Sequence, residues 1–429
     1  MKNIAPKSPP TIAALKKMTI EQRQNYLNKS LQELVAYAYK NAPAIKTRLG
    51  QAGINPTRVR SIDDLQALPV LRKDNLVELC KANPPFGGLI TTSIQNLNRV
   101  YVSPGPIYDP HHKSKNYWRR HAQLMRELGF RKNDTVINAW SYHLVPAGLL
   151  IDESLRRIGV TVVPMGTGNT ELQVQVINHL AVTGFFGAAS FFMNVVTKAE
   201  EMGYDIRRDF KLRVACIGGE MGGGPMRRLV EEKYGIYTAD VYGTADVGLI
   251  AYECKQKFGL HIGEDVIVEI IDPETGKPIA PDGVGELVVT PIDETYPLLR
   301  FGTGDLVGWV NEPCTCGSTS LRITRILGRI GDAVRTRGMF IHTRQMEPAL
   351  ASFTEIAKYQ AVVTREGYRD MLTLKVELKD DASIDKEKLA ERLVREVTKA
   401  VRVKLDRVDY IAKGTIPEGH KLIVDNRVY

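Results

Sequence analysis

Short apolar segments alternate with amphipathic segments through the middle of the chain, between residues 98 and 300. Apolar residues recur at helical spacing in segments such as GPMRRLVEEKYG (224–235), and also over residues 21–39 nearer the start. Four apolar segments have the length and the β-branched or aromatic content of buried strands. They are DTVINAW (134–140), VTVVPMG (160–166), TGFFGAA (183–189) and LRVACIGGE (212–220). The alternation predicts an α/β domain built on a parallel sheet.

The pattern changes near residue 265, where VIVEIIDPETGKPIAPDGVGELVVTP (266–291) indicates two strands joined by a turn. It changes again after residue 328, with a hairpin over 359–378, an amphipathic helix over 384–401 and a last strand at DRVDYIA. We therefore expect a large N-terminal α/β domain with a β-rich portion (1–328) and a small α+β C-terminal domain (329–429). Residues 328–332 would form the hinge between them.

Composition is that of an ordinary globular enzyme: 43% of the 429 residues are hydrophobic and 25% are charged. No apolar run reaches the roughly 18 residues that span a bilayer, and the start MKNIAPKSPPTIAALKK lacks the apolar core of a secretory signal. We expect a cytoplasmic protein that binds neither membrane nor nucleic acid. The net charge of +9 is scattered along the chain, and it suits an anionic ligand such as a nucleotide or coenzyme A.

The cysteines indicate a metal site. Five is an odd number, which argues against a full disulfide framework. Cys254 and His261 are separated by six residues, and Cys314 and Cys316 by one, inside the turn-forming stretch EPCTCGS. Three thiolates and one imidazole are a ligand set of structural zinc, although unbound reduced cysteines are the alternative. Cys80 and Cys216 lie in apolar surroundings and are expected to be buried.

Six motifs occur in the order found in one enzyme family: ADVYGTADVGLIAYEC, GLHIGEDVIVEIIDPETGKPI, GELVVTP, YPLLRFGTGDL, EPCTCG and RILGRIGDAVRTRG. From about residue 30 to its end, the chain resembles the phenylacetate–coenzyme A ligases of the adenylate-forming superfamily. The resemblance implies a large N-terminal domain and a small mobile C-terminal domain. It also implies activation of an aryl carboxylate with ATP and magnesium, followed by transfer of the acyl group to coenzyme A, and it places the two cysteine segments in the same region.

The resemblance assigns the nucleotide site residue by residue. Asp305 in GTGD would accept hydrogen bonds from the ribose hydroxyls, because a carboxylate has two acceptor oxygens. Asp246 would bind magnesium, although the family carries glutamate there and the position before it is Ala245, with Thr244 adjacent. The remaining residues assigned to the nucleotide are Gly218, Gly219, Glu220, Tyr242, Gly243 and Arg329.

The substrate pocket is assigned from two further segments, NAWSYHL and GFFGAASFF. They align with segments that line the aryl pocket in the family, so Tyr142, Phe185 and Phe191 are candidate walls. For each phenylalanine, a place in the hydrophobic core is an equal alternative.

Two segments depart from the family pattern. Where the family has S-S-G-T-T-G-K-P, this chain has SPGPIYDP (103–110), so the turn is kept while both threonines and the lysine are lost, and Asp109 stands where the lysine stood. Losing these donors would remove roughly 4–5 kcal/mol of phosphate stabilisation, or about 10³-fold in rate if all of it acts in the transition state. Near the C-terminus, His420 follows Gly419 where the family has its catalytic lysine, and Lys421 comes one residue later. On a strand, that shift would turn the side chain to the other face unless a bulge restores it.

Three functions remain open at this point. The first is a ligase that activates a small carboxylate despite its altered loop. The second is a family member that has lost adenylation and acts on or binds an acyl-coenzyme A or a nucleotide, and the third, a zinc hydrolase, is disfavoured because four protein ligands leave no position for water. A homodimer is a further option. The pattern does not identify the acid.

Overall fold

The structure is a computed structural model that describes residues 14, 18–103, 107–112, 115–220, 223–273, 275–330, 334–337, 339–341, 343–379, 384–401 and 403–427. The chain divides into two compact units. The first comprises Met1–Gly219 and Gly224–Gly328, and the second comprises Arg329–Tyr429 with the short segment Glu220–Gly223. Among the described residues, we find no helix that is both long and apolar enough to cross a membrane.

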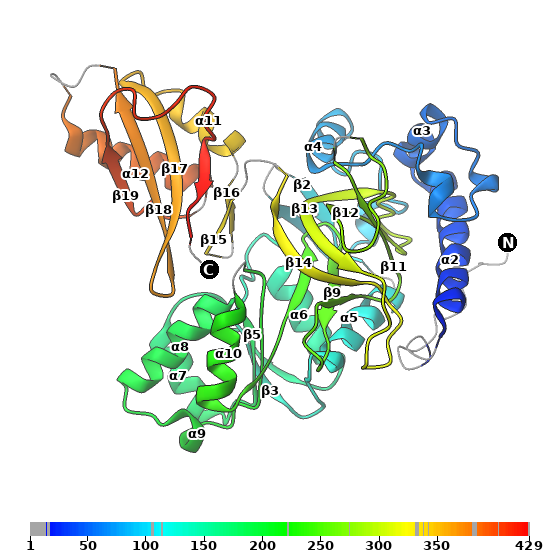
Figure 1. The fold of residues 1–429 in the computed structure, drawn as a ribbon, viewed down its shortest axis with the longest axis horizontal. Coiled ribbons are helices and arrows are strands. Elements are labelled where there is room, and N and C mark those ends of the chain that lie inside the picture. Colours follow the sequence, from blue (N-terminus) through cyan, green and yellow to red (C-terminus); the bar gives the residue numbers. More distant parts are fainter. Residues whose placement is uncertain are drawn as a thin grey trace. The chain divides into compact units, whose positions relative to one another are not determined.

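The first unit begins with helices (Figure 1). They are α2 (Ile20–Asn41), α3 (Pro43–Gln51) and α4 (Lys73–Ala82), with the short 3₁₀ turns η1 (Pro56–Arg58), η2 (Ile62–Leu65) and η3 (Ile94–Asn96). Thr19 caps α2, because its hydroxyl accepts from the Gln22 N–H while the Gln22 side chain accepts from the Thr19 N–H. The apolar face of α2 packs into the main core of this unit through Leu31, Leu34 and Val35.

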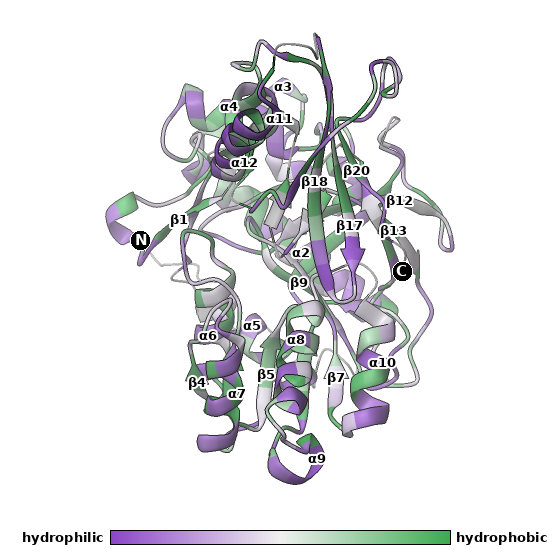
Figure 2. Cartoon of the chain, turned by 90° about the vertical axis from the view of Figure 1, so that its left-hand side faces the viewer, coloured by the Kyte–Doolittle hydropathy of each residue, from purple (hydrophilic) through white to green (hydrophobic). Residues whose placement is uncertain are grey.

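A five-stranded parallel sheet follows, in the order β4-β3-β5-β6-β7. Its strands are β3 (Thr135–Asn138), β4 (Thr161–Val163), β5 (Gly184–Gly187), β6 (Val214–Ile217) and β7 (Tyr237–Ala239). The helices between and around them are α5 (Lys115–Glu127), α6 (Ala147–Arg156), α7 (Thr170–His179), α8 (Ala189–Glu201), α9 (Ile206–Asp209) and α10 (Gly223–Tyr234). Every residue of β5 and β6 is buried, which confirms the predicted buried parallel sheet. Figure 2 shows green and purple patches alternating along α7, α8 and α10, as expected of amphipathic helices.

A seven-stranded sheet completes the first unit, in the order β11-β12-β13-β14-β10-β9-β8. Its strands are β8 (Val241–Thr244), β9 (Gly248–Glu253), β10 (Leu260–Ile262), β11 (Val266–Ile271), β12 (Val284–Pro291), β13 (Phe301–Val310) and β14 (Arg322–Arg329). The β-rich portion expected after residue 265 is part of this sheet. A separate antiparallel hairpin joins β1 (Val100–Ser103) to β2 (Ile107–Pro110), and Pro104, Gly105 and Pro106 of its turn lie outside the described residues.

The second unit is a small α+β fold, as predicted. Its four-stranded sheet has the order β19-β18-β17-β20 and consists of β17 (Ile356–Glu366), β18 (Arg369–Leu378), β19 (Arg407–Tyr410) and β20 (Ile423–Asp425). The other elements are the pair β15 (Val334–Thr336) and β16 (Met339–Ile341), and the helices α11 (Thr343–Leu350) and α12 (Lys386–Val401). Buried residues four apart on α12, from Leu389 to Val401, pack into the core of this unit.

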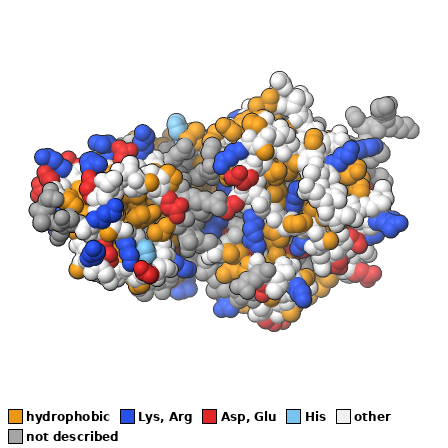
Figure 3. All heavy atoms as spheres, turned by 90° about the horizontal axis from the view of Figure 1, so that it is seen from above, with side chains coloured by type: hydrophobic (Ala, Val, Ile, Leu, Met, Phe, Trp, Pro, Cys, Tyr) orange, Lys and Arg blue, Asp and Glu red, His pale blue; other side chains and the backbone are white. Residues whose placement is uncertain are grey.

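Charged side chains are spread over the surface. In the view of Figure 3, Lys and Arg side chains lie singly or in small groups among acidic and neutral ones. On that face the distribution agrees with the scattered positive charge expected from the sequence.

Candidate functional site

Two strands bring Tyr242 and Asp305 together. Tyr242 lies on β8 and donates a hydrogen bond from its hydroxyl to Asp305 Oδ2 on β13, at 2.6 Å, and both side chains are buried. Gly243 follows, and a Cβ at this position would lie 2.6 Å from the Gly248 carbonyl oxygen, so only glycine fits between the strands. Gly304 has φ +74°, which glycine tolerates best, and it sets the local path of β13 just before Asp305. The structure thus brings together three of the residues assigned to the nucleotide.

Asp246 lies in the turn between β8 and β9. Its side chain is 3% exposed, and Lys73 Nζ at the start of α4 lies 3.6 Å from its Oδ2. Its Oδ1 has no hydrogen-bond partner among the described residues. The hydroxyl of Thr244 accepts from the Val247 N–H at 3.2 Å and so stabilises the turn. The sequence did not point to Lys73, which supplies a cation beside the predicted magnesium ligand.

Asp109 lies near Asp246 and Lys73, on β2 opposite Tyr101 of β1. It is 2% exposed, and neither carboxylate oxygen makes a hydrogen bond of good geometry within the described part of the chain. Burial above all, and the charge of Asp246, raise the pKa of Asp109 to about 7, although Lys73 lowers it. The residue that replaces the lysine of the family is therefore one of two carboxylates that share one ammonium group.

The glycine turn assigned to the adenine follows β6 directly. A Cβ on Gly218 would lie 2.1 Å from Asp240 Oδ1, so a larger residue could not occupy this position without displacing Asp240. Gly219 has φ +76°, and Glu220 comes next in the chain. The Asp240 side chain approaches the backbone of Gly218 closely, which explains why this turn needs glycine.

A small cavity lies beside the turn that carries Asp246, because Ala245 forms part of its wall. The rest of the wall comes from β1, from the end of β2 and the residues that follow it, from α5 and from the start of α6. The lining residues with polar or aromatic side chains are Tyr101, His111, His112, Tyr117 and Trp118. Sequence analysis missed all five, although the adjacent histidines after Pro110 were a signal that could have drawn attention to this segment.

The three candidate walls from the sequence lie elsewhere. Phe185 on β5 is fully buried and packs against Phe192 and Phe191, with ring centroids 4.7 and 6.5 Å away. Tyr142 donates to Asp152 at 2.9 Å and accepts from the Asn138 amide at 2.8 Å. Neither Tyr142, Phe185 nor Phe191 is among the residues that line the cavity.

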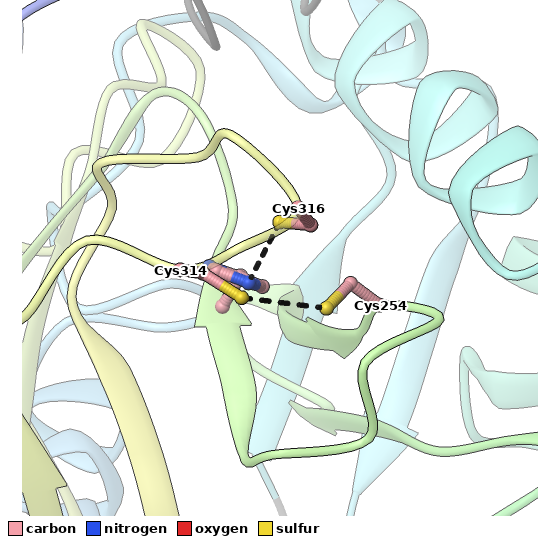
Figure 4. A group of neighbouring side chains, drawn as sticks. Cys254, Cys314 and Cys316 are labelled. Carbon is pink, nitrogen blue, oxygen red and sulfur yellow. Dashed lines mark hydrogen bonds between the residues drawn. The ribbon is translucent and has the colours of Figure 1, made fainter.

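The four predicted metal ligands converge (Figure 4). Cys254, His261, Cys314 and Cys316 offer ligand atoms that all lie within 4.8 Å of one another. The sulfurs of Cys254 and Cys314 are 3.9 Å apart, and Cys316 Sγ lies 3.4 Å from His261 Nε2. Such separations are close to the edges of a tetrahedron around zinc, whose bonds to sulfur and nitrogen are about 2.3 and 2.0 Å. His261 Nδ1 lies 3.0 Å from Ser320 Oγ, and donation to that hydroxyl would let Nε2 serve as the metal ligand.

In the second unit, His420 and Lys421 precede β20 and do not lie on a strand. The alternation of faces expected for a strand therefore does not apply to these two residues. Gly419, just before them, has φ +68° and turns the backbone. Both ring nitrogens of His420 lie 2.9 Å from backbone oxygens, one of Pro417 and one of Tyr359 on β17, while Lys421 is exposed. Arg329, the last residue of β14, is half-buried.

Comparison with known proteins adds relatives over almost the whole chain. A model of the AMP-binding enzyme C-terminal domain matches residues 338–427. The phenylacetate–coenzyme A ligase of Thermus thermophilus is 31% identical over 422 residues, which cover 91% of this chain and 93% of that protein. The enzyme of the same name from Escherichia coli is 30% identical over 377 residues, which cover 85% of this chain and 84% of that protein.

Solved structures share the fold. A 2-hydroxyisobutyryl-CoA ligase in complex with 2-HIB-AMP and CoA superposes with a TM-score of 0.88 at 24% identity, covering 98% of this chain and 94% of that one. The amide bond synthetase McbA from Marinactinospora thermotolerans superposes with a TM-score of 0.59 at 16% identity, covering 92% of both chains. Together with the relatives above, they confirm the resemblance drawn from the motifs: the chain belongs to the phenylacetate–coenzyme A ligase family of adenylate-forming enzymes.

Proposed function

We propose that the protein is an AMP-forming acid–coenzyme A ligase, which activates a small carboxylate with ATP and passes the acyl group to coenzyme A. The observation that carries the proposal is the 31% identity over 91% of the chain to an enzyme named for this activity. The buried hydrogen-bonded pair of Tyr242 and Asp305 supports it, because the resemblance assigns both residues to the nucleotide. Acid-dependent exchange of labelled pyrophosphate into ATP tests the proposal, since exchange requires reversible adenylation of the acid.

Asp305 would hold the ribose. Its carboxylate can accept from both ribose hydroxyls, and the Tyr242 hydroxyl, which donates to Oδ2 at 2.6 Å, fixes its orientation. The glycine turn of Gly218 and Gly219 would let the backbone approach the adenine without a side chain in between. Glu220, Gly243 and Arg329 are proposed to contact the nucleotide as well.

Asp246 would hold magnesium. A buried carboxylate whose Oδ1 has no partner among the described residues fits a hard cation that prefers oxygen ligands. When bound, magnesium would neutralise charge on the phosphates of ATP. Thr244, whose hydroxyl fixes the turn, would keep the Asp246 carboxylate in place.

The loss of the loop lysine predicts slow adenylation. Lys73 could supply part of the positive charge that the loop has lost. Its ammonium group lies 3.6 Å from Asp246 Oδ2 and acts on the charge of Asp109, and its side chain is 40% exposed, so it can turn toward a phosphate. We assign to Lys73 the electrostatic role that the loop lysine has in the family. Asp109 then stays close enough to Lys73 for the two groups to interact electrostatically. His420 and Lys421 remain the candidate catalytic residues of the second unit.

Replacing Lys73 with methionine tests this role. We expect the rate of pyrophosphate exchange to fall about 10- to 100-fold, because a charge-assisted hydrogen bond contributes about 1.5–3 kcal/mol. Lys81→Met is the matched control, since Lys81 lies on the same helix, is 64% exposed and pairs only locally with Glu78 at 3.1 Å. A Lys73→Met protein with full exchange activity but a lower melting temperature would show that Lys73 only balances the buried carboxylates.

Zinc is proposed at Cys254, His261, Cys314 and Cys316. Four protein ligands fill a tetrahedral shell, so the ion would be structural rather than catalytic. It would tie the end of β9 and the strand β10 to the turn at residues 312–320 and thereby support the seven-stranded sheet. The homodimer stays a prediction from the sequence.

A further inference from the structure

One face of α5 packs against the backbone that follows Asp246. Tyr117, Arg120 and His121 have the spacing i, i+3 and i+4, so they lie on the same face of this helix. All three side chains are buried, and Arg120 and His121 have exposed fractions of only 2% and 0%. Residues 247–249, at the end of the turn that carries Asp246 and the start of β9, are in contact with this face.

His121 makes two hydrogen bonds, which together fix its tautomer. Its Nδ1 lies 2.9 Å from the carbonyl oxygen of Tyr117, which can only accept, so Nδ1 carries the proton. Nε2 is therefore an acceptor, and the Leu249 N–H donates to it at 3.0 Å. Burial above all, and the charge of Arg120, lower the pKa of His121 well below its usual range, so the ring stays neutral. The ring thus has the form that can make both hydrogen bonds.

Arg120 holds the backbone next to Asp246. Its Nη2 donates to the carbonyl oxygen of Val247 at 3.3 Å, and its Nη1 lies 3.5 Å from the carbonyl oxygen of Asp265, just before β11. The guanidinium group also lies over the Tyr117 ring, 5.2 Å from its centroid. Arginine is always charged and has no acceptor, so it can hold carbonyl oxygens at any working pH. Arg120 thereby ties the turn to α5 and to the start of β11.

Gly248 lets the helix approach this closely. Its φ is +82°, and a Cβ at this position would lie 2.6 Å from His121 Nε2 and 2.7 Å from the Tyr117 hydroxyl oxygen. Tyr117 is itself braced, because its ring stacks on His112 with centroids 4.1 Å apart, and His112 Nδ1 lies 2.9 Å from Asp293 Oδ2. The contact between α5 and the turn is therefore rigid.

We propose that His121 and Arg120 are positioning residues for the magnesium ligand Asp246. They would act through the backbone of residues 247–249 and would touch neither the metal nor ATP. The inference rests on the role of Asp246 in the proposed ligase function. Magnesium demands near-ideal octahedral geometry, so the place of its carboxylate ligand matters. Aspartate is shorter than the glutamate of the family and has one rotatable bond fewer with which to compensate for a shift of its backbone.

Two replacements of His121 separate its two hydrogen bonds. His121→Gln can place an amide oxygen where Nε2 accepts from the Leu249 N–H, whereas His121→Asn keeps only a donor near Nδ1. We expect the magnesium concentration for half-maximal pyrophosphate exchange to rise about 10-fold in His121→Asn and less than about 3-fold in His121→Gln, because only the first loses the bond to Leu249. His179→Asn is the control, since His179 is exposed at the end of α7.

Affinity for Mn²⁺ with ATP, measured through water proton relaxation, gives a readout that needs no turnover. It should weaken by about the same factors, and it decides the proposal even if no acid supports exchange and the ligase function fails. Equal affinities of His121→Asn, His121→Gln and the unmodified protein would refute the positioning role. A lower melting temperature of His121→Asn with an unchanged magnesium requirement would show a purely structural role and would also refute it.

The unmodified protein offers a check that needs no variant to fold. In ¹⁵N-labelled protein, we expect a scalar coupling between the Leu249 amide nitrogen and an unprotonated Nε2 of His121, transmitted across the hydrogen bond. A His121 ring that carries its proton on Nε2, or that shows no such coupling in an otherwise well-resolved spectrum, would overturn the proposal.

Discussion

Serine in place of Cys314 is expected to remove zinc from the purified protein and to lower the free energy of unfolding by about 3 kcal/mol or more. Four ligand atoms within 4.8 Å of one another in a mostly buried cluster suit a metal that is bound as the chain folds. Without the metal, two buried thiol groups, one half-buried thiol group and a buried imidazole would be left with poor partners. Metal analysis by mass spectrometry and thermal unfolding of the whole chain measure the two effects.

Cys216→Ala is the control for the zinc prediction. Cys216 on β6 is fully buried and does not belong to the cluster, so this variant should lose some packing energy but keep its zinc. Freshly purified protein without zinc, or a Cys314→Ser protein that keeps a full complement of metal, would contradict the assignment.

Asparagine in place of Asp305 should lower kcat/KM for ATP by roughly 10²–10³-fold, because two charge-assisted hydrogen bonds to the ribose contribute about 3–4 kcal/mol together. Asparagine keeps the shape of the side chain but replaces one acceptor oxygen with a donor. Tyr242→Phe should have a smaller effect, of about 10-fold, since it removes only the hydrogen bond that orients Asp305.

Asp282→Asn is the matched control for Asp305→Asn. Asp282 lies in an exposed turn with φ +68°, a conformation that asparagine tolerates well. Steady-state kinetics with ATP as the varied substrate would measure both variants. An Asp305→Asn protein with unchanged kcat/KM for ATP would rule out the ribose assignment.

The sequence predicted the features that depend on local pattern. The strands β3 to β6 and the hairpin of β17 and β18 were recognised because hydrophobic periodicity reports directly on such elements. The metal cluster was also predictable, since its ligands come as two pairs in short segments and the turn-forming residues around Cys314 and Cys316 bring that pair together.

Features that depend on contacts between distant segments were missed. Lys73 lies beside Asp246 because α4 packs near β2 and the turn after β8, and nothing in the local sequence of α4 distinguishes it from Lys81. Tyr142, Phe185 and Phe191 were predicted as pocket walls because their segments align with the aryl pocket of the family, and that assignment stays a prediction. Phe185 is fully buried on β5, since fully buried strands place side chains on both faces in contact with helices, and the half-buried Phe191 of α8 lies beside it.

Acid-dependent exchange of labelled pyrophosphate into ATP by the unmodified protein is the most direct test of the account. With magnesium and at least one acid from a panel of hydroxy, short-chain and aryl acids, the account predicts steady exchange that stops when the acid is omitted and falls in the Lys73→Met protein. No exchange with any acid of a panel of hydroxy, short-chain and aryl acids, from protein that is folded and contains zinc, would contradict the central claim that this site still adenylates a carboxylate.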